Sequence, residues 1–287
     1  MKPSAFAYAR PRALAEAFAL LEAHGENAKL LAGGQSLLAS LNMRLAAPEI
    51  LVDIGAIPGL EGIAVKGKTL VIGARTTHRA IERSDVVARH APLLAKAAPH
   101  IAHIAIRNAG TLGGSLAMAD PAAEWPACCV ALQATIVVAS RTGERRIAAR
   151  EFFKDLYTTA LGPGELITAV EIPCAQPDER QAFLELVRRR GDYAIVGLAA
   201  RARIKGKTLS GVQLVFLGVG VTPVPAKAAM AALEGKAADA AALGAAQGAL
   251  DEDLAPGADL RDLYTSAEAK RHMARVLVAR AVAALLG

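Results

Sequence analysis

Two short stretches of the chain combine paired glycines with small hydroxyl residues, a combination suited to binding phosphate groups. The first is Ala32–Ser36, with the sequence AGGQS, and the second is Thr111–Ser115, with the sequence TLGGS. Because glycine has no side chain, backbone N–H groups in such loops can converge on one anionic oxygen, and nearby hydroxyls can add donors. Two loops of this kind would suit the two phosphates of a pyrophosphate. The residues alone leave a second interpretation open, namely two ordinary tight turns.

Two carboxylates follow the second glycine loop. Asp120 and Glu124 are four residues apart, with Pro121 between them. Proline favours the first turn of a helix, so Asp120 is a candidate N-cap, which is a commoner role than catalysis in this setting. Glu124 either accepts hydrogen bonds from ribose hydroxyls or faces solvent, and the residues do not separate these alternatives.

Several common catalytic and cofactor motifs are absent from the sequence. It contains neither a G-x-x-x-x-G-K-[ST] loop nor an H-E-x-x-H or G-x-S-x-G motif, and GVGVTP at 218–223 has proline where a dinucleotide motif needs glycine. His78 follows two threonines in a helix-cap context. The three cysteines are too few for a disulfide framework or an iron–sulfur site. We therefore expect no metal in this chain and assign no catalytic residue.

Composition and charge narrow the class of protein. Of 287 residues, 53% are hydrophobic and 21% charged, which excludes a disordered polymer. The net charge is +6, yet aromatic residues make up only 4% and the cations are scattered, so nucleic-acid binding is not expected. The one tight basic cluster, Arg188–Arg190, favours docking of an acidic partner. No apolar run is long enough for a membrane span and no secretory signal is evident, so a cytoplasmic protein is expected.

The patterns of helix and strand change along the chain. Before residue 175, apolar helices such as 11–25 alternate with strands rich in β-branched residues, for example 49–54 and 68–74. Two prolines and a charge run interrupt this pattern at 171–181. Beyond it, strands come first and helices follow, and the last helix begins with the capping-box pattern of Thr265–Glu268. This order indicates a separate C-terminal α+β domain.

Five segments occur in the order found in one known family. They are LLAGGQSLL…LVDI, IGARTTH, IRNAGTLGGSLAMADPAAEWPA, FLELVRRRGDYAIVGLAA and SAEAKRHMARVLVARA. Together they span most of the chain, which resembles the FAD-binding medium subunits of molybdenum hydroxylases, the carbon monoxide dehydrogenase and xanthine dehydrogenase group. The resemblance implies an α+β protein with FAD as its cofactor. It predicts an FAD-binding domain of the vanillyl-alcohol-oxidase (PCMH) type at 1–175, made of two α/β subdomains split near 55–60, followed by a smaller α+β domain at 176–287.

The same resemblance implies which residues contact FAD. The two glycine loops would wrap the pyrophosphate, the acidic pair would lie near the ribose and the second loop, two leucines would line the adenine end, and Ile101 and Tyr193 would lie beside the isoalloxazine ring. The complete predicted set is Ala32, Gly33, Gly34, Gln35, Ser36, Leu37, Ile101, Gly110, Thr111, Gly113, Gly114, Ser115, Asp120, Glu124, Leu161, Leu166 and Tyr193.

Some positions depart from the family's pattern. Met118 stands where relatives often have histidine, and Ala109 stands where arginine is frequent. Leu184 and Leu186 occupy a segment where some relatives place a lysine near the cofactor. Gln35 replaces a histidine common in some carbon monoxide-type chains, which weakly disfavours carbon monoxide as the substrate of the assembly. These changes affect individual contacts and leave the FAD assignment in place.

The resemblance also predicts what this chain lacks. A large partner subunit would oxidise the substrate at a molybdenum cofactor, and a small partner would relay electrons through two [2Fe–2S] clusters, in a heterotrimer or a dimer of heterotrimers. The FAD would then pass the electrons to NAD⁺, oxygen, a quinone or another carrier. Two alternatives remain open: a stand-alone FAD-dependent oxidase of a small alcohol, and a nucleotide-binding scaffold without redox function. The substrate is not readable, because its pocket would belong to the partner.

Overall fold

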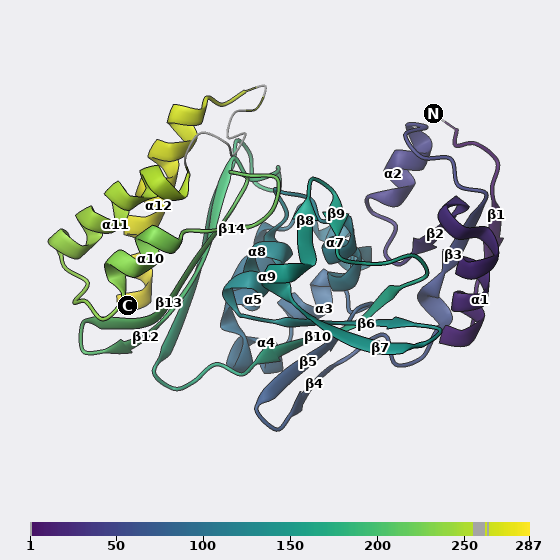
Figure 1. Ribbon diagram of the computed structural model, residues 1–287, viewed down its shortest axis with the longest axis horizontal. Helices are drawn as coiled ribbons and strands as arrows, with labels where there is room; N and C mark the ends of the chain where they lie inside the picture. The colour runs from purple at the N-terminus through teal and green to yellow at the C-terminus, as the bar shows by residue number, and fades with distance from the viewer. Residues whose placement is uncertain (1, 255–261, 263) are drawn as a thin grey trace.

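The described residues form three main sheets, placed one after another along the longest axis of the molecule (Figure 1), and one two-stranded sheet. The computed structural model describes residues 2–254, 262 and 264–287. The N-terminal sheet lies at one end, a five-stranded sheet with its helices lies in the middle, and the C-terminal sheet with three helices lies at the other end. This mixture of helices and strands confirms the predicted α+β class.

The N-terminal sheet is small and entirely parallel, with strand order β1–β3–β2. Its strands are β1 (Ala7–Ala9), β2 (Ala28–Leu31) and β3 (Ile50–Asp53), and its helices are α1 (Leu14–His24) and α2 (Leu37–Asn42), with short 3₁₀ turns at Gly25–Asn27 and Ile54–Ala56. Helix α1 buries Ala17, Phe18 and Leu21 in the core of this unit. As expected, it ends at Gly25, whose φ of +51° suits glycine.

The middle sheet is antiparallel, with strand order β4–β5–β10–β6–β7. Its strands are β4 (Ile63–Lys66), β5 (Thr69–Gly73), β6 (Thr135–Ser140), β7 (Gly143–Ala148) and β10 (Leu166–Pro173). Because β10 lies between β5 and β6, the chain returns to the centre of this sheet after building the helices and a two-stranded hairpin, β8 (Phe153–Asp155) and β9 (Thr158–Thr159).

Short helices connect β5 to β6 and cover this sheet. They are α3 (His78–Glu82), α4 (Asp85–His90), α5 (Pro92–Ala97), a 3₁₀ turn η3 (Ala98–His100), α6 (Ile104–Ala109), α7 (Leu112–Met118) and α8 (Glu124–Ala131), and α9 (Ala149–Phe152) follows β7. Helix α8 is entirely buried beyond its first residue and carries Trp125, Cys128 and Cys129 into the core. Its thiols have raised pKa values because of burial, so they are packed and unreactive.

The C-terminal unit is an antiparallel sheet with helices on one face. Its strands are β11 (Glu179–Leu186), β12 (Val196–Lys205), β13 (Thr208–Leu217) and β14 (Val224–Pro225), and its helices are α10 (Lys227–Leu233), α11 (Ala240–Asp253) and α12 (Ala267–Leu286). Strand alternation buries both faces: Leu214 and Phe216 of β13 pack under the helices, whereas Val215 and Leu217 join the middle core. The sheet is therefore shared between the two units.

A single glycine connects the C-terminal helix with the loop that precedes α8. The N–H of Gly218 donates to the carbonyl of Pro121 (2.9 Å), and its carbonyl accepts a hydrogen bond from Lys270 Nζ (2.8 Å). Lys270 is buried and also lies 2.9 Å from Asp262. Helix α12 begins after Ser266, whose hydroxyl accepts from the Ala269 N–H, so the capping residue of the predicted box is Ser266 rather than its first residue.

Candidate functional site

One cavity of about 640 Å³ opens between the N-terminal unit and the helices of the middle unit. Six separate stretches of the chain line it, within residues 29–46, 54, 74–78, 101–124, 161–167 and 191–193. All seventeen predicted site residues are part of this lining: Ala32, Gly33, Gly34, Gln35, Ser36, Leu37, Ile101, Gly110, Thr111, Gly113, Gly114, Ser115, Asp120, Glu124, Leu161, Leu166 and Tyr193. Cavities of this size hold small molecules and cofactors.

The first glycine loop connects β2 to α2 and leaves backbone donors free. Within the described part of the chain, the N–H groups of residues 33–36 make no hydrogen bond, while the Gly33 carbonyl accepts from the side chain of Gln35 (3.2 Å). Gly34 has a φ of +73°, a conformation that glycine adopts without strain. This loop therefore presents a row of unpaired donors to the cavity, as an anionic group requires.

The second glycine loop uses its donors differently. Thr111 caps α7, with its Oγ1 accepting from the Gly114 N–H (3.1 Å), and the Gly113 N–H donates to the carbonyl of Ala74 (2.8 Å). Since both glycine N–H groups bond within the protein, the expected convergence of donors from both loops is not present. The hydroxyls of Thr111 and Ser115 stay available, because the hydrogen of Thr111 Oγ1 is free to be donated.

The absence of side chains at these glycines allows close packing of neighbouring backbone, and it also leaves space in the cavity. A Cβ on Gly33 would lie 2.2 Å from the carbonyl oxygen of Ala109 and 2.8 Å from the Cα of Gly110, so the first loop is in direct contact with the segment that precedes the second loop. A Cβ on Gly113 would lie 2.6 Å from that of Ala74. Gly114 differs, because its Cβ would meet only Thr111 Oγ1 (2.8 Å) and, at 3.9 Å, Ala32. Of the four paired glycines, Gly114 is the one where an added side chain extends into the cavity.

Asp120 does not cap α8, so the N-cap expectation was wrong. The helix begins at Glu124, and its capping residue Ala123 has no side chain that could bond to it. Asp120 instead holds the preceding turn, where its Oδ1 accepts from the Ala122 N–H (2.9 Å). Burial raises the pKa of Asp120, and the hydrogen bond from Ala122 opposes that rise.

Glu124 is partly buried and lines the cavity, which favours its cavity-facing alternative over the solvent-facing one. Burial raises its pKa to about 8, and repulsion from the carboxylate of Glu185 adds to the effect. Glu124 therefore carries a proton at neutral pH and can donate a hydrogen bond as well as accept one. Tyr193 lies close by, since Glu124 and Asp120 both raise its pKa, although burial has the larger effect.

Tyr193 lies at the mouth of the cavity and is 74% exposed. Its loop packs against the segment that carries Ile101, since a Cβ on Gly191 would lie 2.9 Å from the ring of His103. Arg107 fixes that segment by donating to the carbonyls of Ile101 and Ala102, each at 3.0 Å. The cavity end with Ile101 and Tyr193 is thus built from two interlocked loops.

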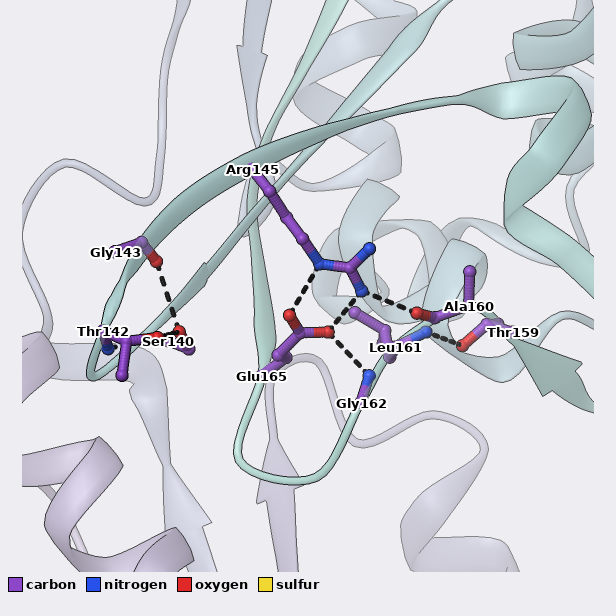
Figure 2. A network of polar contacts seen from close by, with 9 residues as sticks. All are labelled: Ser140, Thr142, Gly143, Arg145, Thr159, Ala160, Leu161, Gly162 and Glu165. Carbon is purple, nitrogen blue, oxygen red and sulfur yellow. Dashed lines mark hydrogen bonds and ion pairs between the residues drawn. The ribbon is translucent and has the colours of Figure 1, made fainter.

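An ion pair shapes the loop that carries Leu161, another residue of the cavity lining. Figure 2 shows Arg145 of β7 reaching across to Glu165, with bonds of 2.7 and 2.6 Å, and to the carbonyl of Ala160 at 2.7 Å. Glu165 also accepts from the Gly162 N–H at 2.6 Å. The pair closes the turn between β9 and β10 and so positions Leu161 and Leu166, which line the cavity.

Sequence reasoning missed His78, which also lines the cavity. It begins α3, which Thr77 caps, as the threonine pair indicated. Trp125 Nε1 donates to His78 Nδ1 at 2.8 Å, so the remaining proton of the neutral ring is on Nε2. Burial lowers the pKa of His78 to about 4, with Arg107 contributing. The only tryptophan of the chain offered a signal, because a buried indole N–H requires an acceptor.

Other candidate sites are not supported within residues 2–254, 262 and 264–287. No group of three or more histidine, cysteine or carboxylate side chains is arranged to hold a metal ion there. None of the helices described for this chain has the length and apolar character needed to cross a bilayer.

Both parts of the chain match known families. Residues 4–175 match the family described as FAD binding domain in molybdopterin dehydrogenase, and residues 181–285 match the CO dehydrogenase flavoprotein C-terminal domain. The chain is 38% identical to the carbon monoxide dehydrogenase medium chain of Hydrogenophaga pseudoflava, over 98% of this chain and 97% of that one. It is 41% identical to subunit alpha of the 6-hydroxypseudooxynicotine dehydrogenase complex of Paenarthrobacter nicotinovorans, over 80% and 78%.

Comparison with a solved structure shows that the fold is similar as well as the sequence. Carbon monoxide dehydrogenase from Hydrogenophaga pseudoflava, in a form lacking the Mo-pyranopterin moiety of the molybdenum cofactor, contains a chain that superimposes with a TM-score of 0.95. The two chains are 39% identical, and the match covers 99% of this chain and 98% of the other.

Proposed function

Because this chain belongs to the family of FAD-binding medium subunits of molybdenum hydroxylases, we propose that its cavity holds FAD and serves electron transfer. One observation carries the proposal. The seventeen positions singled out in the sequence come from separate segments, yet all of them line one cavity of about 640 Å³. Such a cavity suits an extended cofactor with an anionic middle and two aromatic ends.

The chemistry of the lining fits the parts of FAD. The unpaired N–H groups of residues 33–36 and the hydroxyl of Ser115 are donors for the pyrophosphate oxygens. Lys29 also lines the cavity and adds a positive charge for the phosphates. The absence of a side chain at Gly114 leaves room for the cofactor. We assign the pyrophosphate to this middle section, bound mainly by the first loop.

The two ends of the cavity suit the two ring systems of FAD. Leu161 and Leu166 provide apolar surface for the adenine, held in place by the Arg145–Glu165 pair. Ile101 and Tyr193 provide apolar and aromatic surface for the isoalloxazine ring. Glu124 and His78 lie in the same lining and offer hydrogen-bonding groups without a full charge at neutral pH.

Bound FAD would supply the redox chemistry, and the side chains would position it and control access. Ile101 and the tethering Arg107 define one wall of the ring site, and the exposed Tyr193 covers its mouth. His78, fixed by Trp125, offers an N–H donor whose orientation does not vary. The protein thus orients the ring and limits the entry of water.

We further propose the assembly in which this chain works. Relatives are named as a medium chain or as a subunit of a complex. We infer a large partner subunit with a molybdenum cofactor and a small partner with two [2Fe–2S] clusters, in a heterotrimer or a dimer of heterotrimers in the cytoplasm. Electrons from the clusters would reach FAD and leave for an external acceptor, and the basic cluster Arg188–Arg190 near Tyr193 is our candidate docking surface.

The three main sheets support a division of the chain into domains. We place the FAD-binding domain at residues 1–175, with two subdomains that meet near 55–60, and the C-terminal domain at 176–287. The parallel sheet of residues 7–53 and the antiparallel sheet of residues 63–173 would form the two subdomains. The cavity lies where they meet, which is a common place for a cofactor.

Flavin content after purification tests the proposal. The wild-type chain should retain FAD or bind it when it is added, and Gly114→Leu should lose it, because leucine fills the space assigned to the cofactor. Gly244→Leu is the matched control, since that glycine lies on an exposed helix surface with no atom within 4 Å. A folded G114L variant with normal flavin content would refute the assigned site. Turnover of a small alcohol by the isolated chain would refute the subunit role.

A further inference from the structure

The turn at Ile101–Ala102, which joins η3 to α6, has a strained backbone where it lines the cavity. Ala102 has a φ of +41°, in the left-handed region that residues other than glycine rarely adopt. Both residues of the turn belong to the cavity lining, at the cavity end that also contains Tyr193. A residue in this conformation persists only where the surrounding structure holds it there. Contacts around the turn must therefore keep Ala102 in its strained form.

Arg107 of α6 holds the carbonyl groups on both sides of the strained residue. Its Nη1 donates to the carbonyl oxygens of Ile101 and Ala102, each at 3.0 Å. One of these oxygens belongs to the peptide before Ala102 and the other to the peptide after it, so the two bonds together fix its φ and ψ. The side chain of Arg107 is only 12% exposed, which strengthens both bonds because little water competes for them.

Glu82, the last residue of α3, fixes the guanidinium group of Arg107 in turn. Arg107 Nε donates to Glu82 Oε2 at 3.1 Å, and the side chain of Glu82 is itself only 15% exposed. Arg79 Nη1 donates to the same oxygen at 2.8 Å. Because the donors of a guanidinium lie in one rigid plane, a bond at Nε also sets the direction of Nη1. The ion pair thus connects the end of α3 to the turn.

The carbonyl of Ala102 also supports the loop that carries Tyr193. A Cβ on Gly191 would lie 3.1 Å from this carbonyl oxygen, so the backbone of that loop packs directly against the turn. One oxygen atom therefore accepts a hydrogen bond from Arg107 and also packs against the Tyr193 loop. A shift of the turn would move both loops that form this end of the cavity.

The residue before the turn has an anchor of its own. His100 ends η3, and its Nδ1 lies 3.0 Å from Oε2 of Glu185 in β11. The edge of its ring packs against Phe183, with centroids 5.2 Å apart. This anchor does not involve Arg107, so the loss of Arg107 would leave His100 in place. Any change of backbone conformation should then be confined to the turn, which lines the cavity.

We propose that Glu82 and Arg107 are positioning residues for the isoalloxazine ring of bound FAD, an inference that rests on the proposed function. Glu82 orients Arg107, and Arg107 holds the turn in its strained form. The turn then holds Ile101 directly and Tyr193 through Gly191. Neither charged side chain is part of the cavity lining, so both act on the ring only through this backbone.

Two substitutions in the ion pair test the proposal in the flavin-loaded chain. Glu82→Gln keeps the shape of the side chain but removes the charge that orients Arg107, and Arg107→Gln removes the donors to the turn. In both variants the dissociation constant of FAD should rise by about tenfold. The visible absorption band of the bound flavin should also shift towards that of free FAD, because the ring is held less firmly.

Arg79→Gln is the matched control for these two variants. Arg79 donates to the same oxygen of Glu82, but it has no bond to the turn within the part of the chain that the structure describes. This variant should retain the FAD affinity and the absorption band of the wild type, whatever its effect on stability. Equal weakening of FAD binding in all three variants would overturn the proposal, because the ion pair would then have a structural role only.

Adding Ala102→Gly separates positioning of the turn from a general loss of stability. Glycine adopts a positive φ without strain, so a turn with glycine no longer depends on Arg107 to hold it. The double variant E82Q/A102G should therefore recover most of the FAD affinity that E82Q loses, although the bond between α3 and α6 stays weakened. Failure of Ala102→Gly to restore FAD affinity would overturn the role of the strained turn.

Amide exchange in the flavin-free chain gives a measurement that does not depend on the proposed function. In E82Q and R107Q, exchange at 100–104 and 190–193 should speed up by about tenfold or more, because both loops lose their common support. Unchanged exchange, or wild-type FAD affinity, in both variants would overturn the inference alone. A wild-type chain that binds no FAD would overturn the proposed function and, with it, the role of the ion pair towards the ring.

Discussion

Replacing Gly33 with alanine tests the direct contact between the first glycine loop and Ala109–Gly110, the segment that precedes the second loop. The new Cβ would lie 2.2 Å from the carbonyl oxygen of Ala109, whereas real Cβ atoms stay at least 3.0 Å from such neighbours. The loops must therefore separate by about 1 Å, in a region packed at the density of a protein interior. Overpacking of this kind costs about 1–3 kcal/mol, because backbone rather than a flexible side chain has to move.

The assay for Gly33→Ala is thermal unfolding together with FAD titration. Each kcal/mol should lower the unfolding midpoint by roughly 2–4 °C in a chain of this size. In the variant, FAD binding must bring the separated segments back to their wild-type positions. FAD affinity should therefore fall by about tenfold for each 1.4 kcal/mol that this costs. The matched control is Gly248→Ala, where nothing lies within 4 Å of the added Cβ and the helix should gain about 1 kcal/mol. Equal midpoints and equal FAD affinity for G33A and the wild type would refute the loop contact.

Three further predictions follow from hydrogen bonds and ionisation. Trp125→Phe removes the donor to His78 Nδ1 and should lower the free energy of unfolding by about 1–3 kcal/mol, which urea titration measures; an unchanged midpoint would contradict the buried pair. Arg145→Ala should change overall stability little but speed amide exchange at 160–165, and unchanged exchange would show that the ion pair does not hold this loop. The folded state raises the pKa of Glu124 from 4.5 to about 8, so the wild-type free energy of unfolding should fall as pH rises through that window. Glu124→Gln should reduce this fall. Parallel pH profiles of the variant and the wild type would exclude a raised pKa at Glu124.

Local sequence signals predicted much of the fold. The β-branched runs became strands, Gly25 ended the first helix, and Thr77 capped α3, because each of these depends on residues that are neighbours in sequence. Helix α8 runs over Glu124–Ala131. Its end is set by Gln133, whose φ of +52° breaks the helix without the usual glycine.

The sequence predicted which residues line the cavity but not which interactions they make. Matching motifs indicated seventeen lining positions, and the cavity contains all of them. The reason for bare backbone at Gly33 depends on Ala109, which is distant in sequence, so no local pattern revealed it. The same applies to Glu185 and His100, whose pairing joins β11 to η3. Asp120 was misassigned because a turn and a helix cap share the same sequence pattern.

Gly218 restricts how this chain can be recombined with its relatives. Its N–H bonds to Pro121 beside the cavity, and its carbonyl bonds to Lys270 of the last helix. A chimera joined near residue 175 would keep the Gly218–Lys270 bond, because both residues lie in the C-terminal half, but would place a foreign segment on one side of the Gly218–Pro121 bond. Transplanting a C-terminal half therefore requires an N-terminal half whose loop at position 121 presents its carbonyl to Gly218. The two halves are therefore matched to each other at this contact.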